Sequence, residues 1–228
     1  MSIRVAAGGF LLVAPLWFTT TFALLGKRFD YPDILRRPVT EILDRFRAGG
    51  SSLILLWWMF MVSGILLIPA VVLLGQALGF EGIVPLAVTA GVIAALVQVL
   101  GLLRWVYLVP TLARMEEEAA PGDAQRDVAV AIFSAMHRYV GVGIGEHLGY
   151  LFTGLWSLLT GVAILGTHPI PGWIGWVGIS VGAGLVAGSG EFLGRDEDRG
   201  WALARAAIPI LYIVWSLWLV GMGITLII

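Results

Sequence analysis

The sequence of 228 residues contains no cysteine, which excludes a disulfide scaffold, a thiolate metal site and a cysteine nucleophile. Charged residues are also scarce, at 13%, and the formal net charge is only −1, which excludes a nucleic-acid-binding surface and intrinsic disorder. What the chain has instead is 59% hydrophobic residues, 30 glycines and 10 tryptophans. This composition is typical of helical membrane proteins, where small residues let helices approach and indoles lie at the interfaces.

The apolar residues are gathered in runs long enough for membrane helices, which need about 20 residues to cross a hydrocarbon layer of about 30 Å. Six runs reach that length: residues 5–25, 51–75, 83–112, 140–166, 171–193 and 203–228. The first is longer than the apolar part of a signal peptide and is followed by Lys27 and Arg28, so we expect a retained helix. No repeat or linker divides the chain. Residues 1–228 are therefore predicted to form a single all-α, polytopic membrane domain of six transmembrane helices.

Basic residues are distributed unequally between the two sets of connections. Twelve of the 14 lysines and arginines follow the first, third and fifth runs, whereas residues 76–82 and 167–172 contain none. Cytoplasmic loops of membrane proteins are enriched in basic residues. We therefore expect both termini to lie outside and the three basic connections to lie in the cytoplasm.

Two of these connections have the apolar periodicity of an amphipathic helix. In residues 38–47, Pro38 suits the first turn and Gly49-Gly50 suits the end of a helix. Residues 124–139 follow Asp123, a suitable N-cap. We expect both helices to lie along the cytoplasmic membrane surface, either as connectors or as a docking face for a protein partner.

Several polar side chains fall inside the predicted spans, where each costs roughly 2.5–3.5 kcal/mol if it is charged and so requires a reason. The third span contains Gln98 and Arg104, the fourth contains Glu146 and His147, and the fifth contains Glu191. The fourth span also has a polar stripe at helical spacing. The stripe consists of Glu146, Tyr150, Thr153, Ser157 and Thr160. Glycines at 141, 145 and 149, at 178 and 182, and at 184 and 188 predict close packing of the fourth and fifth spans, with the third against them.

Two interpretations of these polar residues remain open. In one, Arg104 and Glu146 form an ion pair that fastens helices together, as intramembrane charges commonly do. In the other, Arg104, Glu146, His147, Glu191, Gln98 and Tyr150 line a cavity open to the cytoplasm. There Arg104 would hold an anion, Glu146 and His147 would handle a proton, and Glu191 would lie at the mouth.

Specific cofactor chemistries find little support in the residues. His137 and His147 are too far apart on one helix to ligate one haem, and His168 falls in a connection. His147, Glu146 and Glu191 are the only candidates for a metal site, and they lack a metal-binding spacing, so no metal or other cofactor is expected. Gly188-Ser189-Gly190 resembles a protease nucleophile fragment, yet the sixth span has no histidine to serve as base. Most tryptophans, Trp57 among them, are interpreted as interfacial anchors, whereas Trp105 is a candidate pocket wall.

Three segments carry a family resemblance: Phe29-Asp30-Tyr31-Pro32-Asp33-Ile34-Leu35-Arg36, residues 98–110, and Gly145-Glu146-His147-Leu148-Gly149-Tyr150. Together they resemble the bacterial integral membrane proteins of domain-of-unknown-function family 4386, over nearly the whole chain. The resemblance implies a multi-pass protein of the bacterial inner membrane and implies nothing about a substrate.

The favoured hypothesis is an inner-membrane protein that binds or transports a small molecule, anionic or proton-coupled, through a cytoplasm-facing polar cavity. The first alternative is a non-catalytic accessory or assembly subunit whose buried charges fasten helices. The second is a membrane enzyme acting on a lipid or isoprenoid group, with Glu146 or His147 as general base. The expected partners are the lipid bilayer, a small-molecule ligand and a protein on the amphipathic helices.

Overall fold

The computed structural model describes residues 2–120, 123–166, 170–194 and 200–228, and these residues form helices and turns with no strand among them. His168, Arg195 and Arg199, which the sequence places in connections, lie outside the described residues. The helices are α1 (Ile3–Phe29), η1 (Asp33–Arg36), α2 (Val39–Ala77), α3 (Val84–Tyr107), α4 (Val109–Glu118), α5 (Ala124–Met136), η2 (His137–Leu148), α6 (Gly149–Leu165), α7 (Gly172–Gly188) and α8 (Ala202–Ile227).

Five continuous helical stretches in the described part of the chain are long and apolar enough to cross a membrane. They are α1, α2, α3 with α4, α5 with η2 and α6, and α8. The protein is therefore a multi-pass membrane protein. The predicted span 171–193 corresponds to α7, which has 17 residues and ends earlier than predicted, at Gly188. The Ser189 hydroxyl donates to the Val186 carbonyl at that end, and a turn follows instead of further helix.

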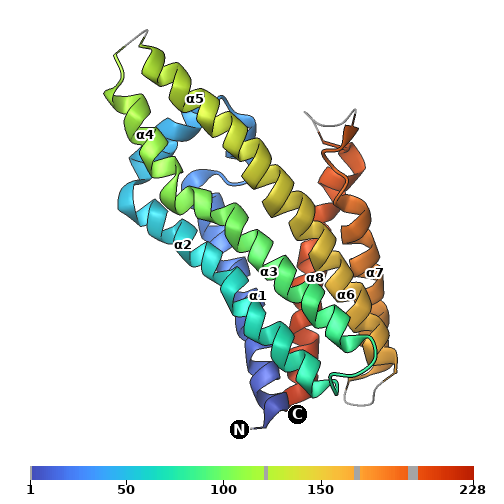
Figure 1. Ribbon diagram of the computed structural model, residues 1–228. Coiled ribbons are helices and arrows are strands. Elements are labelled where there is room, and N and C mark those ends of the chain that lie inside the picture. The colour runs from blue at the N-terminus through green and yellow to red at the C-terminus, as the bar shows by residue number, and fades with distance from the viewer. Residues whose placement is uncertain (1, 121–122, 167–169, 195–199) are drawn as a thin grey trace.

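Six helices pack side by side in a closed circuit, which we call the helix ring (Figure 1). Its order is α1, α2, α3, α6, α7, α8 and back to α1, and every successive pair is in extensive contact. The side chains that point away from the neighbouring helices are apolar and exposed, as lipid contact requires. The side chains that point inward fill the centre of the ring.

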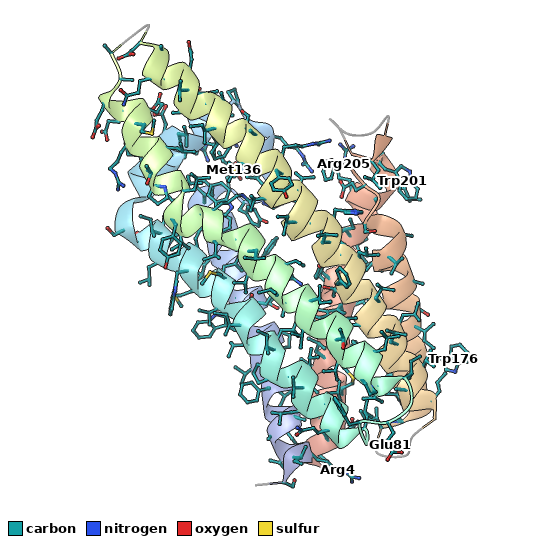
Figure 2. The ribbon with its side chains drawn as sticks, in the orientation of Figure 1. Arg4, Glu81, Met136, Trp176, Trp201 and Arg205 are labelled. Carbon is teal, nitrogen blue, oxygen red and sulfur yellow. The ribbon has the colours of Figure 1, made fainter. Side chains whose placement is uncertain are left out.

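The two ends of the ring differ in their connections. Both termini lie at the end opposite the hairpin of α4 and α5 (Figure 1). Arg4 and Glu81 lie at the terminal end, whereas Met136, Trp201 and Arg205 lie toward the other (Figure 2). The α1–α2, α4–α5 and α7–α8 connections share that second end, which we call the basic end because the basic connections of the sequence gather there.

One predicted helix boundary is confirmed. Gly50 has φ 54° and ψ −156°, which interrupts α2 where Gly49-Gly50 was expected to end the first amphipathic helix. The third span, predicted as one run over residues 83–112, instead breaks at Leu108, and Pro110 lies in the first turn of α4.

The second amphipathic segment is arranged differently from the prediction. Residues 124–136 form α5, which continues through η2 into α6 without a break and pairs with α4 as a hairpin (Figure 1). A separate helix lying along the surface was expected there. The expectation was wrong because no glycine or proline ends α5 before Tyr139, so the helix simply continues into the span.

Glycine-to-backbone contacts join the central helices, as predicted. A Cβ atom on Gly154 would lie 2.7 Å from the Gly182 carbonyl oxygen, and one on Gly161 would lie 2.5 Å from that of Gly175, so α6 and α7 touch through their backbones. A Cβ on Gly101 of α3 would lie 2.6 Å from the Gly145 Cα in η2. Gly184 and Gly188, in contrast, face side chains of α8 rather than α6.

Candidate functional site

The candidate site begins with η2, a π-helical segment of 12 residues between α5 and α6. π-helical turns are rare and occur frequently at functional sites. In this segment Gly141 and Gly145 lie against α3, and Gly149, which follows it, lies against the Gln98 side chain. The close approach of α3 and η2 brings Arg104 and Glu146 into the same region of the ring.

Glu146 belongs to η2, and its side chain is half-buried rather than sealed from solvent. It interacts electrostatically with Arg104 and with Glu191. Three tyrosines from different elements also lie within electrostatic range of its carboxylate. They are Tyr31 in the α1–α2 connection, Tyr150 in α6 and Tyr212 in α8. The carboxylate thus lies within electrostatic range of three phenol groups and one guanidinium.

Tyr31 lies between the helices α1 and η1, and the charges of the site act on its phenol group. Burial raises the pKa of its phenol well above the usual value. The negative charge of Glu146 raises this pKa further, and the positive charge of Arg104 opposes the shift. The charges of Glu146 and Arg104 therefore both act on the Tyr31 phenol group.

Hydrogen bonds connect the polar stripe of α6 to its neighbours. The Gln98 Nε2 group donates to Thr153 Oγ1 across 3.1 Å, and the Tyr212 hydroxyl also bonds to Thr153. The Tyr150 and Tyr212 rings are in edge contact, with centroids 5.6 Å apart. Thr153, Ser157 and Thr160 are all buried, so the stripe faces the interior of the ring as predicted.

Beyond Thr153, toward the terminal end, the interior is closed by tryptophans. The Trp156 ring contacts those of Trp215 and Trp218, with centroids 6.0 and 5.7 Å apart. Trp215 Nε1 donates to Ser157 Oγ across 3.0 Å, and Trp218 Nε1 donates to the Ile174 carbonyl across 2.8 Å. The polar site is therefore bounded on that side by three indole rings, and the N–H groups of Trp215 and Trp218 have acceptors.

Arg104 is buried, with 9% of its surface exposed, and no ion pair joins it to Glu146 or to any other described carboxylate. One of its Nη groups donates to the Gly101 carbonyl, its Cζ lies 5.4 Å from the Trp105 ring centroid, and its Nε has no hydrogen-bond partner. The direct Arg104–Glu146 pair of the first interpretation is absent from the described residues. Glu146 acts on Arg104 over a longer distance.

His147 points in another direction from Glu146. Its Nδ1 lies 2.7 Å from the Ser189 carbonyl oxygen at the end of α7, which assigns a proton to Nδ1 because the carbonyl oxygen can only accept. The sequence placed Glu146 and His147 together as a proton-handling pair. The structure joins His147 to α7 instead, while Glu146 interacts electrostatically with Arg104.

Glu191 lies three residues beyond α7 in the turn at the basic end, and not in a membrane helix as predicted. Its side chain is buried against Gly200. Burial raises the pKa of this carboxyl, and the positive charges of Arg205 and Arg36 oppose the shift. The residue lies at the basic end of the site.

No group of three His, Asp or Glu side chains that could hold a metal ion is found in the described part of the chain. His147, Glu146 and Glu191 do not form such a group.

Three participants in this region were not identified from the sequence. Tyr31 and Tyr212 lie outside the polar stripe of the fourth span. Tyr31 belongs to the segment Phe29–Arg36, which resembles the family but has no assigned role. Trp57 was interpreted as an interfacial anchor, which is wrong. It is fully buried and stacks on Trp105, with ring centroids 4.4 Å apart.

The model of one protein family matches residues 6–223, and its description is "Domain of unknown function (DUF4386)". The chain therefore belongs to this family, as the resemblance implied. Comparison with curated proteins and with solved structures finds no match.

Proposed function

We propose that the protein crosses the bacterial inner membrane six times and binds or transports a small polar solute at a site centred on Glu146. In this proposal α7 is the sixth span, both termini lie outside, and the basic end faces the cytoplasm. The favoured solutes are anions or molecules moved together with a proton.

One observation carries the proposal: Glu146 is half-buried rather than sealed, although none of the basic side chains that the structure describes pairs with it directly. A carboxylate that served only to fasten helices would be expected to contact its cation and to be sealed from solvent. The three tyrosine hydroxyls within its electrostatic range can both donate and accept hydrogen bonds from a solute, and Gln98 lies nearby against Gly149. The tryptophans beyond Thr153 favour access from the basic end alone in this conformation.

The alternative is an accessory subunit in which the buried charges stabilise the packing of the helices. It makes a different prediction for the same residues. If Arg104 and Glu146 stabilise the fold together, Arg104→Leu and Glu146→Gln will each lower stability in detergent, and the double variant will recover it. On the proposal made here, the double variant gives no such recovery.

Thermal unfolding in the presence of solutes tests the binding site directly. A panel of short-chain carboxylates, inorganic phosphate, amino acids and primary amines is titrated into the purified protein. A solute at 100 times its Kd stabilises a protein by about 2.7 kcal/mol. We expect at least one solute to stabilise the protein, with a response that changes in Glu146→Gln and is unchanged in Glu81→Gln at the terminal end. Equal responses of all three proteins to every solute would refute the proposal.

The proposed orientation can be tested by cysteine labelling, because the chain has no cysteine of its own. In inside-out vesicles, a membrane-impermeant maleimide is expected to label Asp123→Cys in the α4–α5 connection and not Glu81→Cys. The reverse pattern would invert the orientation.

A further inference from the structure

Helix α5 has two apolar faces, and only one of them is covered. Ala129 and Phe133 are buried, and the Phe133 ring contacts that of Trp105 in α3, so this face attaches the α4–α5 hairpin to the rest of the protein. The opposite face is exposed, with Val128 at 47% and Ile132 at 37%. We call it the α5 stripe, and it consists of Ala124, Val128, Ala131, Ile132, Ala135 and Met136.

The α5 stripe is as wide as the apolar face that a helix normally buries. At about 100° per residue, its members lie within an arc of about 140°. Helices of globular proteins commonly bury an arc of about 100° or more. The two charged residues of α5, Arg126 and Asp127, lie outside this arc. An uncharged face of this width on an exposed helix therefore requires a partner.

Lipid acyl chains do not provide that partner. Helix α5 forms one continuous stretch of 42 residues with η2 and α6, and about 20–25 residues cross a hydrocarbon layer. Counted from Leu165 at the terminal end, this length reaches only into η2. The hairpin of α4 and α5 projects past the basic-end termini of α7 and α8 (Figure 1). The α5 stripe therefore lies beyond the hydrocarbon layer.

The lipid headgroups of the cytoplasmic leaflet also match the hairpin poorly. That leaflet is negatively charged, and helices that lie on it carry Lys and Arg on their polar face. Arg126 is already paired with Glu116. Among the described residues of the hairpin, exposed acidic side chains outnumber exposed arginines. The acidic side chains are Glu117, Glu118, Asp123 and Asp127, whereas the exposed arginine is Arg114.

A second copy of the chain matches the α5 stripe in spacing and in charge. Val128, Ile132 and Ala135 are separated by four and then three residues, as in the seam of a parallel two-stranded coiled coil. The membrane holds all copies in one orientation and in one plane, which makes the pairing parallel and lowers its entropic cost. Stripe positions that flank this seam carry no charge, so identical helices meet without repulsion. These positions are Ala124, Ala131 and Met136.

We propose that two copies of the protein associate through the α5 stripe, about a two-fold axis along the membrane normal. Equivalent seam residues of the two copies then face each other. The small Ala135 side chain lets the helices approach closely, while Asp127 and Ser134 on the polar face stay in solvent. This interface is separate from the solute site of the proposed function and does not depend on it.

Cysteine cross-linking tests the seam directly, because the chain has no cysteine of its own. The full-length protein is placed in liposomes of phosphatidylcholine and phosphatidylglycerol, with enough lipid to make chance encounters rare, and is then oxidised. A disulfide requires Cα atoms about 4.4–6.8 Å apart. We expect Val128→Cys and Ala135→Cys to give covalent dimers. Ser134→Cys lies at the same height on the polar face and is the matched control, which should stay monomeric.

A charge placed in the seam tests the energetics of pairing. Ile132→Asp is expected to raise the dissociation constant of the dimer at least tenfold, because pairing would bring two unpaired carboxylates into an apolar seam. Ser134→Asp adds the same charge to the polar face and should leave the constant unchanged. Counting photobleaching steps of protein labelled at Glu81→Cys, over a series of lipid dilutions, measures both constants.

The proposal is overturned if the three cysteine variants cross-link equally or not at all. Equal dimerisation of Ile132→Asp and Ser134→Asp would overturn it as well. A fluorophore attached to Ile132→Cys distinguishes the remaining occupant. Its quenching by brominated acyl chains would assign the α5 stripe to the membrane surface, against the proposal, whereas cross-linking without such quenching supports the dimer.

Discussion

Glu116 of α4 lies 2.5 Å from Arg126 of α5, the shortest contact in an ion triad that also includes Arg47 of α2 at 3.1 Å. The Glu116 side chain is only 3% exposed. Removing one partner of a buried ion pair leaves an uncompensated charge behind. The triad therefore fastens the α4–α5 hairpin to α2, which is the role the sequence suggested for Arg104 and Glu146.

The Arg47 and Arg126 side chains are 33% and 41% exposed, so replacing Glu116 by Gln should destabilise the hairpin by about 1.5–3 kcal/mol, as for the loss of a hydrogen bond to a charged group. Unfolding of the purified protein in detergent measures this loss. The exposed neighbour Glu117, whose contact with Arg47 is 3.7 Å, provides the control. Glu117→Gln should change stability by less than about 1 kcal/mol. Similar losses of stability in the two variants would show that the ion triad stabilises the hairpin no more than an exposed ion pair does.

The backbone contact between α6 and α7 leaves no room for a methyl group at Gly161. A Cβ there would lie 2.5 Å from the Gly175 oxygen and 2.8 Å from the Ile179 nitrogen. Gly161→Ala should cost about 1–3 kcal/mol through overpacking. Gly221→Ala in α8 meets nothing within 4 Å and should be neutral or stabilising, since alanine favours helix. Equal effects at the two positions, measured by unfolding in detergent, would contradict the close packing.

Gly141 has a different neighbour, the flexible end of Arg104. A Cβ at Gly141 would lie 2.7 Å from Arg104 Nη2, whereas a Cβ at Gly143 would meet only the Arg138 carbonyl oxygen, at 3.7 Å. Gly141→Ala should therefore displace the guanidinium while leaving the fold intact. We expect the stabilising response to anionic solutes of the panel to weaken in Gly141→Ala and to persist in Gly143→Ala. An unchanged response in Gly141→Ala would show that Arg104 takes no part in binding the solute.

The hydrogen bond between Gln98 and Thr153 lends itself to a double-mutant cycle. Such cycles between membrane helices give coupling energies of about 0.6 kcal/mol on average, with a maximum of about 1.7. The cycle of Gln98→Leu and Thr153→Val should give a value in this range, since Thr153 is fully buried and its hydroxyl also serves Tyr212. A coupling of zero in unfolding measurements would mean that the two groups act independently.

Glu191 should make stability depend on pH. Burial raises its folded-state pKa above the unfolded value, so the folded state binds the proton more tightly. The resulting stabilisation is fully present at pH values below the unfolded pKa and is lost as the pH rises through the folded pKa. Glu191→Gln removes this dependence. The wild-type protein should therefore lose stability relative to the variant as the pH is raised from 4 to 8, and parallel unfolding curves would contradict the assignment.

Hydrophobic length predicted the long apolar helices, and the glycine spacing predicted the close packing of α6 on α7, although Gly184 and Gly188 face α8 instead. Glu191 illustrates the limit of counting along a sequence. The apolar run continues to Leu193, whereas the helix ends at Gly188, where Ser189 donates to the preceding turn. The length of an apolar run contains no information about that hydrogen bond, so it could not predict where the helix ends.

The residues of the site were predicted less completely, because a residue takes part in the site only if its side chain points toward it. Tyr150 belongs to the polar stripe, which one helix defines alone, and Gln98 joins it through its hydrogen bond to Thr153. His147 contacts Ser189 of the α7 end although Glu146 is its neighbour in sequence, because adjacent residues of a helix point about 100° apart. Trp57 and Tyr31 join the region through contacts between helices distant in sequence, and no local pattern encodes these contacts.

Each member of the helix ring is held by two neighbours, and among the described residues α8 has the least extensive contacts of the six. The glycine contacts that lock α6 to α7 have only one counterpart on α8, where Gly223 approaches the Gly8 oxygen of α1. Lateral separation of α8 therefore breaks less packing than separation of any other helix. It would expose Tyr212 and the centre of the ring directly to the acyl chains, a sideways route for a solute that carries a hydrocarbon tail.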